Sequence, residues 1–317
     1  MAQNPIQFQA GMSLSELFQQ YGTESQCEAA LEKSRWPHGF ACPHCGEHRH
    51  SRFHQGHRTY WQCSGCRKQT SLRSGTIFQG SNLPLTVWFQ AMFLISQSKN
   101  NISALELKRQ LGVAYSSAWR VKHKLMQVMA EREEKRVLSG HVVIDDAYLG
   151  GELRGKAGRG SVNKVPFVAA VQLDEDERPQ VVRFDRVDGF RKQEIADWTA
   201  RFMEPGSHVV SDGLNCFPGV TEHGISHQRE IVGKGRRSTD MPCFAWINTL
   251  LGNLKTALAG TYHAFRFKKY AHRYLAEYQY RFNRRADLKA MLPRLLRAAV
   301  TTPPRSEPWL RLAEHAS

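Results

Sequence analysis

The stretch VVIDDAYLGG, residues 142–151, decides how the second half of the chain is interpreted. Its three β-branched apolar residues predict a buried strand, and this strand runs directly into Asp145 and Asp146. Because successive side chains of a strand point to opposite faces, we expect only one of the two acids to enter any one site. A second β-branched run ends at Asp212, which a glycine follows. Two carboxylates at neighbouring strand ends suit a divalent cation, although Asp212 taken alone fits ordinary turn chemistry.

The pattern around this stretch predicts an α/β domain. Strand-like runs occupy residues 141–145, 165–173, 180–184 and 208–212, with a helix-like segment at 191–203. Helical patterns occupy residues 13–35, 85–137 and 242–285. Capping boxes are expected at Ser13 and Thr23. The last residues, which include TTPPRSEP, are typical of a short helix followed by a loose tail.

The composition favours a polyanionic partner. The 317 residues carry a formal net charge of +15, and 41% of them are apolar. This length suits two or three domains, and the basic excess makes nucleic acid the first partner to consider, ahead of a merely basic soluble enzyme. No stretch approaches the roughly 18 uncharged apolar residues of a membrane span. The absence of a signal-peptide pattern and the odd number of cysteines, seven, favour a reducing interior.

Four cysteines form two CxxC pairs, CPHC (Cys42 and Cys45) and CSGC (Cys63 and Cys66), with 17 residues between them. This spacing predicts a structural zinc site with four cysteine ligands, in which each pair supplies two thiolates from one tight turn. The segment is too polar to form a core of its own, so the metal would supply its folding energy. A redox pair is the other interpretation. The alternative metal ligands are five nearby histidines: His44, His48, His50, His54 and His57.

A helix-turn-helix pattern follows at residues 103–129. Ser103 and Glu106 fit a capping box, Gly112 ends the first helix, and a second helix is expected over residues 115–129. This is the layout of a DNA-binding helix-turn-helix, although many helical hairpins of this kind bind nothing. The second helix carries the basic residues expected to meet phosphates or base edges: Arg120, Lys122, His123 and Lys124.

Two polar residues lie on the apolar segment INTLLGNLKTALAGTYH, residues 247–263. Asn248 and Lys255 are seven residues apart, which is almost two helical turns, so they share one face of the expected helix. An asparagine on such a face needs a buried partner. Glu277, in the stretch YLAEYQY, is a spare carboxylate for the same region.

The order of these motifs resembles that of bacterial insertion-sequence transposases of the zinc-ribbon, Merlin/ISXO-like group, over about residues 13–290. The resemblance is carried by the zinc ribbon, the helix-turn-helix, IDDAYLGGELRGKAGRGSVNKVPFVAAV, SDG, INTLLGNLKTALAGTYH and YQYRFNRR. It implies an α/β, RNase H-like mixed-sheet catalytic domain preceded by a zinc ribbon and a helical helix-turn-helix domain. The implied divisions are an N-terminal helical segment 1–36, a zinc ribbon 37–72, a helix-turn-helix domain 73–137, a catalytic domain 138–290 and a C-terminal tail 291–317.

The resemblance also implies a catalytic site. The two acids of the family fall on Asp145 and Asp212, and its third metal ligand falls on Asn248, where many members have glutamate. An Asp-Asp-Asn triad followed by lysine is a variant of the group. These residues would hold two Mg²⁺ or Mn²⁺ ions, and Lys255 would touch a phosphate near the scissile bond. Two Gly-rich basic runs beside this site are expected to follow the DNA backbone rather than to be only solvated loops, through Arg154, Lys156, Arg159, Lys164, Lys234, Arg236 and Arg237.

The implied activity is metal-dependent DNA cleavage and strand transfer of an insertion sequence. The implied partners are double-stranded DNA, both the terminal inverted repeats of the element and the target, and further copies of the chain in a homodimer or larger oligomer. The expected location is the bacterial cytoplasm, without a membrane. Two alternatives stay open: a DNA-binding regulator that has lost catalysis, which Asn248 favours, and a nuclease of RNase H-like fold that lacks strand transfer.

Overall fold

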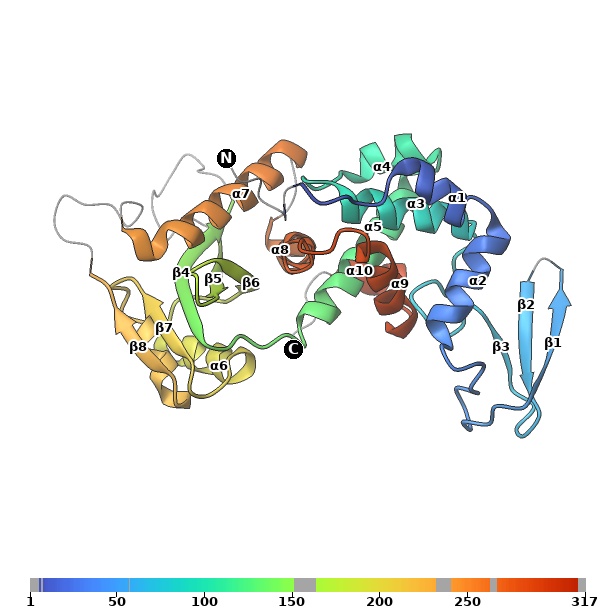
Figure 1. Cartoon of the computed structure of the whole chain (residues 1–317), viewed down its shortest axis with the longest axis horizontal. Helices are drawn as coiled ribbons and strands as arrows, with labels where there is room; N and C mark the ends of the chain where they lie inside the picture. The colour runs from blue at the N-terminus through green and yellow to red at the C-terminus, as the bar shows by residue number, and fades with distance from the viewer. Residues whose placement is uncertain are drawn as a thin grey trace. The chain divides into compact units, whose positions relative to one another are not determined.

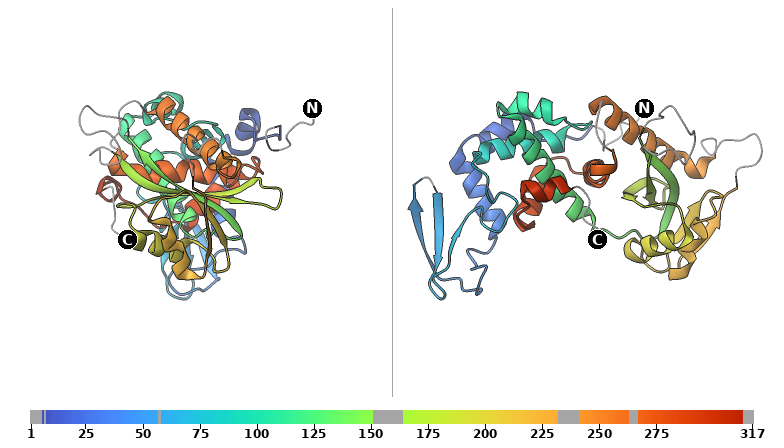
Figure 2. Two further views of the ribbon diagram at one scale, coloured as in Figure 1. Left: turned by 90° about the vertical axis from the view of Figure 1, so that its left-hand side faces the viewer. Right: turned by 180° about the vertical axis from the view of Figure 1, so that it is seen from behind.

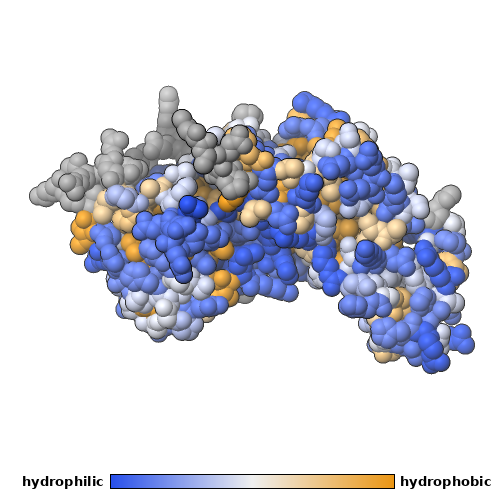
Figure 3. Space-filling view, viewed as in Figure 1, coloured by the Kyte–Doolittle hydropathy of each residue, from blue (hydrophilic) through white to orange (hydrophobic). Residues whose placement is uncertain are grey.

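The structure is a computed structural model that describes residues 6, 8–56, 58–150, 164–231, 241–262 and 267–312. The chain divides into two compact units, one formed by Met1–Met129 with Ala286–Leu312 and the other by Ala130–Arg285 (Figure 1). Across the described ranges, no helix is both long and apolar enough to cross a membrane. Hydrophilic residues cover most of the face drawn in Figure 3, and apolar residues are scattered between them.

Helices make up most of the first unit: α1 (Leu14–Tyr21), α2 (Glu24–Arg35), α3 (Leu85–Gln97), α4 (Ala104–Leu111), the greater part of α5 (Tyr115–Glu133), α9 (Met291–Thr301) and α10 (Glu307–Leu312). The capping boxes predicted at Ser13 and Thr23 are present, and at the start of α4 the Ser103 hydroxyl accepts the N–H of Glu106. The Ser13 hydroxyl accepts the N–H of Glu16 at 3.1 Å, and the Glu16 carboxylate accepts the N–H of Ser13 at 2.7 Å. Thr23 and Gln26 make the equivalent pair of bonds at the start of α2. Both helices therefore begin where the local sequence predicted.

A three-stranded antiparallel sheet follows α2, and Figure 2 shows it from two further sides. Its strands are β1 (His50–Gln55), β2 (Arg58–Cys63) and β3 (Gln69–Ser71). Trp61 on β2 is 1% exposed, and its ring centroid lies 5.0 Å from that of Trp36 at the end of α2. The Arg35 guanidinium, in the last turn of α2, donates to the carbonyls of Ser71 and Leu72 at 2.7 Å. These contacts hold the small sheet against α2.

The segment expected as a C-terminal tail contributes to the core of the first unit. Helix α9 packs against α2 and α3. Its buried residues include Leu292, Leu295, Leu296 and Ala299. Their spacing of i, i+3, i+4 and i+7 places them on one helical face, and burial of that face explains why the segment docks instead of remaining loose.

The second unit is built on a five-stranded mixed sheet in the order β6-β5-β4-β7-β8. Its strands are β4 (His141–Leu149), β5 (Val165–Leu173), β6 (Pro179–Arg186), β7 (His208–Ser211) and β8 (Ser226–Arg229). Neighbours among β4, β5 and β6 are antiparallel, whereas β7 is parallel to both β4 and β8. The mixed α/β architecture expected from the sequence is therefore present, with the short polar strand β8 in addition.

Helical segments cover this sheet: α6 (Lys192–Phe202), η1 (Phe217–His223), η3 (Pro242–Phe244), α7 (Ala245–Thr261) and α8 (Phe267–Phe282). Ile144 of β4 lies in a core with Trp198 of α6 and Phe217 of η1. Because strand side chains alternate, the next residue, Asp145, starts out on the face away from this core. Helix α7 packs against β4 and β5, and α8 against β5 and β6.

The motif YQYRFNRR, residues 278–285, closes the open edge of β6. The side-chain oxygen of Gln279 accepts the N–H of Phe184 at 2.9 Å. Asn283 accepts the N–H of Val182 at 2.8 Å and donates to the Val182 carbonyl at 3.0 Å. These amides satisfy backbone groups that an exposed edge strand would otherwise offer to another chain.

A buried ion pair ties the end of α5 to the same motif. Glu133 is 2% exposed, its carboxylate pairs with Arg284, and it accepts from Asn283 at 2.7 Å. Arg183 of β6, which is 1% exposed, donates to the Glu133 carbonyl at 3.0 Å. Paired charges of this kind are tolerated inside a protein only when their hydrogen bonds are satisfied, so these contacts fix the last turn of α5 within the second unit.

Candidate functional site

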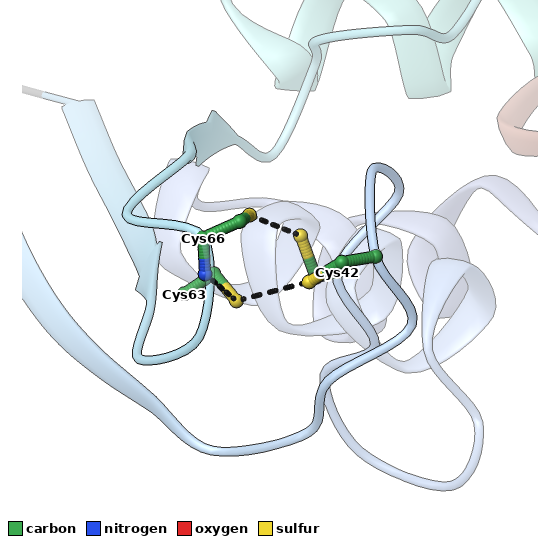
Figure 4. A group of neighbouring side chains, drawn as sticks. Cys42, Cys63 and Cys66 are labelled. Atoms are coloured by element: carbon green, nitrogen blue, oxygen red, sulfur yellow. Dashed lines mark hydrogen bonds between the residues drawn. The ribbon is translucent and has the colours of Figure 1, made fainter.

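Four cysteines of the first unit meet in one cluster. The Sγ atoms of Cys42, Cys45, Cys63 and Cys66 all lie within 4.8 Å of one another. The sulfurs of Cys42 and Cys66 are 3.6 Å apart (Figure 4). Those of Cys45 and Cys63 are 3.5 Å apart. Ligand sulfurs about 2.3 Å from a tetrahedral zinc ion are roughly 3.8 Å from each other. The four positions therefore fit one structural zinc ion.

Each CxxC pair forms the same tight turn. The N–H of Gly46 donates to the Cys42 carbonyl at 2.9 Å, and the N–H of Arg67 donates to the Cys63 carbonyl at 3.1 Å. Both residues that follow the pairs have positive φ, 77° at Gly46 and 61° at Arg67. Glycine adopts this conformation readily, whereas arginine does so only where the surrounding structure requires it. Arg67 adopts this conformation because the turn has to place Cys66 beside Cys63.

The histidines considered as alternative ligands do not join the cluster within the described part of the chain. The Nδ1 atom of His48 lies 2.9 Å from the Phe40 carbonyl, and that of His50 lies 2.8 Å from the His48 carbonyl. His57 lies outside the described residues. The cysteine cluster is therefore the set that suggests structural zinc.

A second cluster consists of three carboxylates. One oxygen from each of Asp145, Asp146 and Asp212 lies within 4.8 Å of the other two. Strand β7 pairs with β4 only as far as Ile144 opposite Ser211, so the described sheet places no strand on this side of β4 beyond Ile144. The N–H of Asp146 donates to Oδ1 of Asp145 at 2.9 Å. Asp145 therefore lies one residue beyond the last pairing of β4 with β7.

The structure corrects the expectation that only one of the two adjacent acids enters the site, because the carboxylates of both Asp145 and Asp146 approach Asp212. Alternation along a strand fixes the direction of each Cα–Cβ bond. It does not fix where the carboxylate ends when the strand edge beside it is open. To predict this, one would need to know where β7 stops pairing with β4, and no local pattern around residue 145 contains that information.

The charges of this cluster favour the binding of a cation. Burial raises the pKa of Asp145 to about 7, the charges of Asp146 and Asp212 contribute to the rise, and the Lys255 cation opposes it. Like charges at this separation disfavour the ionised state. Carboxylate oxygens are also the ligands that hard divalent cations prefer, so the three acids fit Mg²⁺ or Mn²⁺.

Hydrogen bonds hold the end of β7 in place beside these acids. The Asp212 carboxylate accepts the N–H of Leu214 at 3.0 Å. The Ser211 hydroxyl donates to the Asp212 carbonyl at 2.9 Å and lies 2.8 Å from Nε2 of His227 on β8. The polar strand β8, which the sequence pattern did not predict, thus supports the strand end that presents Asp212.

Helix α7 carries the two remaining candidate residues. Asn248 is half-buried, and its Nδ2 atom is buried with no hydrogen-bond partner among the described residues. Because the nitrogen and oxygen of an asparagine amide exchange places by rotation, this side chain can present its oxygen to a cation instead. Lys255 is exposed, and its charge acts on Asp145. The amide oxygen of Asn248 and the ammonium group of Lys255 are therefore groups that suit a carboxylate cluster with a cation.

Glu277, the spare carboxylate, has a different environment. It is fully buried and accepts the hydroxyl of Tyr262, the residue after α7, at 3.2 Å. It is not part of the acidic cluster within the described residues. Its observed contact joins the end of α7 to α8.

The basic residues expected to face DNA on α5 are mostly covered. Lys122 and Lys124 are 1% and 4% exposed, and the Lys124 ammonium donates to the Ile77 carbonyl at 2.7 Å. Arg120 is partly exposed and pairs with Glu307 of α10 at 2.9 Å. Lys122 and Lys124 are thus both buried and not presented to a duplex in this structure.

One of the seven basic loop candidates lies within the described residues. Lys164 is half-buried just before β5. The remaining candidates lie outside the described residues: Arg154, Lys156, Arg159, Lys234, Arg236 and Arg237.

The chain is similar to known transposase domains in the two segments that contain these clusters. The ISXO2-like transposase domain matches residues 137–283, which contain the three acids, and the transposase zinc-ribbon domain matches residues 22–69, which contain the four cysteines. A relative from Halobacterium salinarum, described as an uncharacterized protein in transposable element ISH50, is 26% identical over 137 residues. The match covers 42% of this chain and 45% of the relative. Because this relative is archaeal, it gives no support to the bacterial origin expected from the sequence.

Proposed function

The chain is an ISXO2-like transposase with a zinc-ribbon domain, and from this premise we propose that it is an active enzyme that cuts DNA at the ends of an insertion sequence and joins them to a target. The observation that carries the proposal is the cluster of Asp145, Asp146 and Asp212 at one strand edge. Phosphoryl transfer by paired cations requires such a cluster of carboxylates. DNA cleavage and strand transfer are both displacements at phosphorus, so one site suffices for both.

In this proposal Asp145, Asp212 and Asn248 hold two Mg²⁺ or Mn²⁺ ions, which would polarise the scissile phosphate and activate the attacking hydroxyl. The contribution of the protein is positional. Asp145 lies in the middle of β4, just beyond its last pairing with β7, and Asp212 directly follows β7, whose end is fixed by the hydrogen bonds of Ser211. With its pKa near 7, Asp145 gives up its proton easily when a cation binds.

We assign to Lys255 a contact with a DNA phosphate beside the acids. It is exposed on α7, and its charge favours the ionised form of Asp145. An ammonium group in this position attracts the polyanion towards a cluster that would otherwise repel it.

We assign DNA recognition to α4 and α5 as a helix-turn-helix. The N-terminal residues of a recognition helix contact base edges, and Tyr115 and Ser116 at the start of α5 are exposed. Lys108 and Arg109, at the end of α4, are also exposed and suit phosphates. The mixed sheet supports the RNase H-like interpretation of the second unit. Because two element ends must be brought together, we also propose that the chain acts as a homodimer or a larger oligomer.

A second candidate is a DNA-binding regulator without catalysis. Asn248 favours it, because a neutral amide oxygen binds a divalent cation more weakly than the glutamate that the family resemblance implies for many members. The acidic cluster argues against it, since three acids held together destabilise a protein that gains nothing from a cation.

Cleavage of a labelled duplex carrying the element's own end, in Mg²⁺ or Mn²⁺, tests the proposal. The proteins compared are the parent, Asp212→Asn, and Asp188→Asn as a matched control, since the Asp188 side chain is 79% exposed. We expect the parent and the control to cut the duplex and to join it to target DNA, and Asp212→Asn to bind without cutting. Cleavage by Asp212→Asn at the parent's rate would refute the site. Binding without cleavage by all three would favour the regulator, and cleavage without joining would favour a nuclease.

A further inference from the structure

We infer that Asp146 is a third carboxylate ligand of the proposed metal centre and replaces the acid that Asn248 does not supply. The inference rests on the proposed function, because it concerns the cations of that site. It is carried by the approach of Asp146 to both Asp145 and Asp212, which strand alternation alone does not predict.

The open edge of β4 makes this approach possible. Beyond Ile144, β4 is paired with β5 on one side, and β7 no longer pairs with it on the other. At this point of β4 the Asp145 carboxylate accepts the N–H of Asp146. One carboxylate oxygen of Asp146 lies within 4.8 Å of oxygens of both Asp145 and Asp212, so both adjacent acids approach Asp212.

The charge of the site explains why a third acid is needed. Two divalent cations carry four positive charges, whereas Asp145 and Asp212 supply two negative charges and Asn248 supplies none. In family members with glutamate on the late helix, the third ligand is anionic. Asp146 restores this missing negative charge from β4, without any change in α7.

Two other acids of the second unit, the buried Glu277 and the half-buried Asp185, make contacts away from the cluster. Glu277 accepts the Tyr262 hydroxyl away from the cluster. Asp185 accepts from Arg183 at 2.5 Å and from the Trp198 indole at 2.8 Å. Asp146 is the additional acid of the described chain that lies at the cluster itself.

Binding of Mn²⁺, measured from the loss of the free-ion electron paramagnetic resonance signal, tests the inference without relying on cleavage. The proteins are the full-length, zinc-loaded parent, Asp146→Asn, Asn248→Glu, the double variant, and Asp188→Asn as the control. We expect Asp146→Asn to weaken Mn²⁺ binding at least about tenfold, since even indirect metal contacts contribute this much. Asn248→Glu in the same chain should restore most of the affinity, and the control should bind as the parent does.

A folding control accompanies the titration. In the absence of divalent cations other than zinc, Asp146→Asn should unfold at the same temperature as the parent or higher, because it removes a repelling charge. Loss of binding without loss of stability separates a ligand from a structural residue.

The outcomes separate this inference from the proposed function. Parent-like Mn²⁺ affinity in Asp146→Asn, with loss in Asp145→Asn and Asp212→Asn, would overturn the role of Asp146 and leave the site intact. Parent-like affinity in all three would overturn the site itself. Weakened binding that Asn248→Glu fails to restore would overturn the claim that Asp146 replaces the missing acid.

Discussion

Asp145→Asn should stabilise the protein in the absence of Mg²⁺ and Mn²⁺ and should reduce its stabilisation by Mn²⁺. Without a cation, Asp145 ionises in a half-buried position beside Asp146 and Asp212. Asparagine has nearly the same shape and carries no charge, so the substitution removes the repulsion and keeps the packing.

Two estimates give the size of this gain. Unit charges at the 4.8 Å limit within which these oxygens lie repel each other by about 3.5 kcal/mol at an effective dielectric constant of about 20. Burial and the two neighbouring acids raise the pKa of Asp145 from 3.8 to about 7. At about 1.4 kcal/mol for each pKa unit, ionisation costs roughly 4 kcal/mol more in the folded protein than in the unfolded chain. The free energy of unfolding should therefore increase by up to about 4 kcal/mol.

The gain should depend on pH. Because folding raises the pKa of Asp145, the folded parent binds more protons than the unfolded chain between about pH 4 and pH 7. The stability of the parent therefore falls as the pH rises through this window, and the variant lacks this contribution. The difference should be small near pH 4 and approach its full value at pH 8.

Urea unfolding at pH 5 and pH 8, with zinc retained and without other divalent cations, measures this difference. Asp188→Asn, which changes an exposed acid, serves as the control at both pH values. Added Mn²⁺ should stabilise the parent by mass action and stabilise Asp145→Asn much less. A variant that is less stable than the parent at pH 8, or a difference that does not grow between pH 5 and pH 8, would refute the reasoning.

Three further predictions concern other parts of the molecule. Cys63→Ser should lower the zinc content from about one ion per chain to nearly none, because three remaining thiolates leave the tetrahedral site incomplete; metal analysis of the purified protein checks this, and full zinc retention would contradict it. Lys255→Met should reduce DNA cleavage by about 100-fold with Mn²⁺ binding retained, and unchanged single-turnover cleavage would remove the assigned phosphate contact. Glu133→Gln should lower the free energy of unfolding by about 3–5 kcal/mol, because it leaves the buried Arg284 without its charge partner. In urea unfolding, Arg284→Met in the same chain should recover most of that loss, and equal stabilities of the single and double variants would argue against the pair.

Much of the fold was predictable because its signals are local. The spacing of Cys42, Cys45, Cys63 and Cys66 is itself the geometry of two ligand turns, and the cluster forms as expected. The capping boxes at Ser13 and Thr23 involve residues three apart, so the chain alone specifies where α1 and α2 begin. The family resemblance is confirmed by the two matching domains.

Burial was harder to predict, because it depends on which elements pack together. On α5, no local pattern indicated that Lys124 would donate to the Ile77 carbonyl or that Arg120 would pair with Glu307. The partners are 47 and 187 positions away in the chain, so no helical pattern within residues 115–129 contains them. The same applies to α9, whose apolar face is visible in the sequence but whose neighbours α2 and α3 are not.

The sequence by itself determined that an acid follows each of two β-branched runs, at Asp145 and at Asp212, and that these runs form buried strands. Only the tertiary structure decided which acids meet. Strand β7 stops pairing at Ser211, while β4 continues to Leu149. Because side chains at an unpaired edge can turn towards it from either face, Asp145 and Asp146 both join Asp212 in the cluster, where alternation had allowed only one of them.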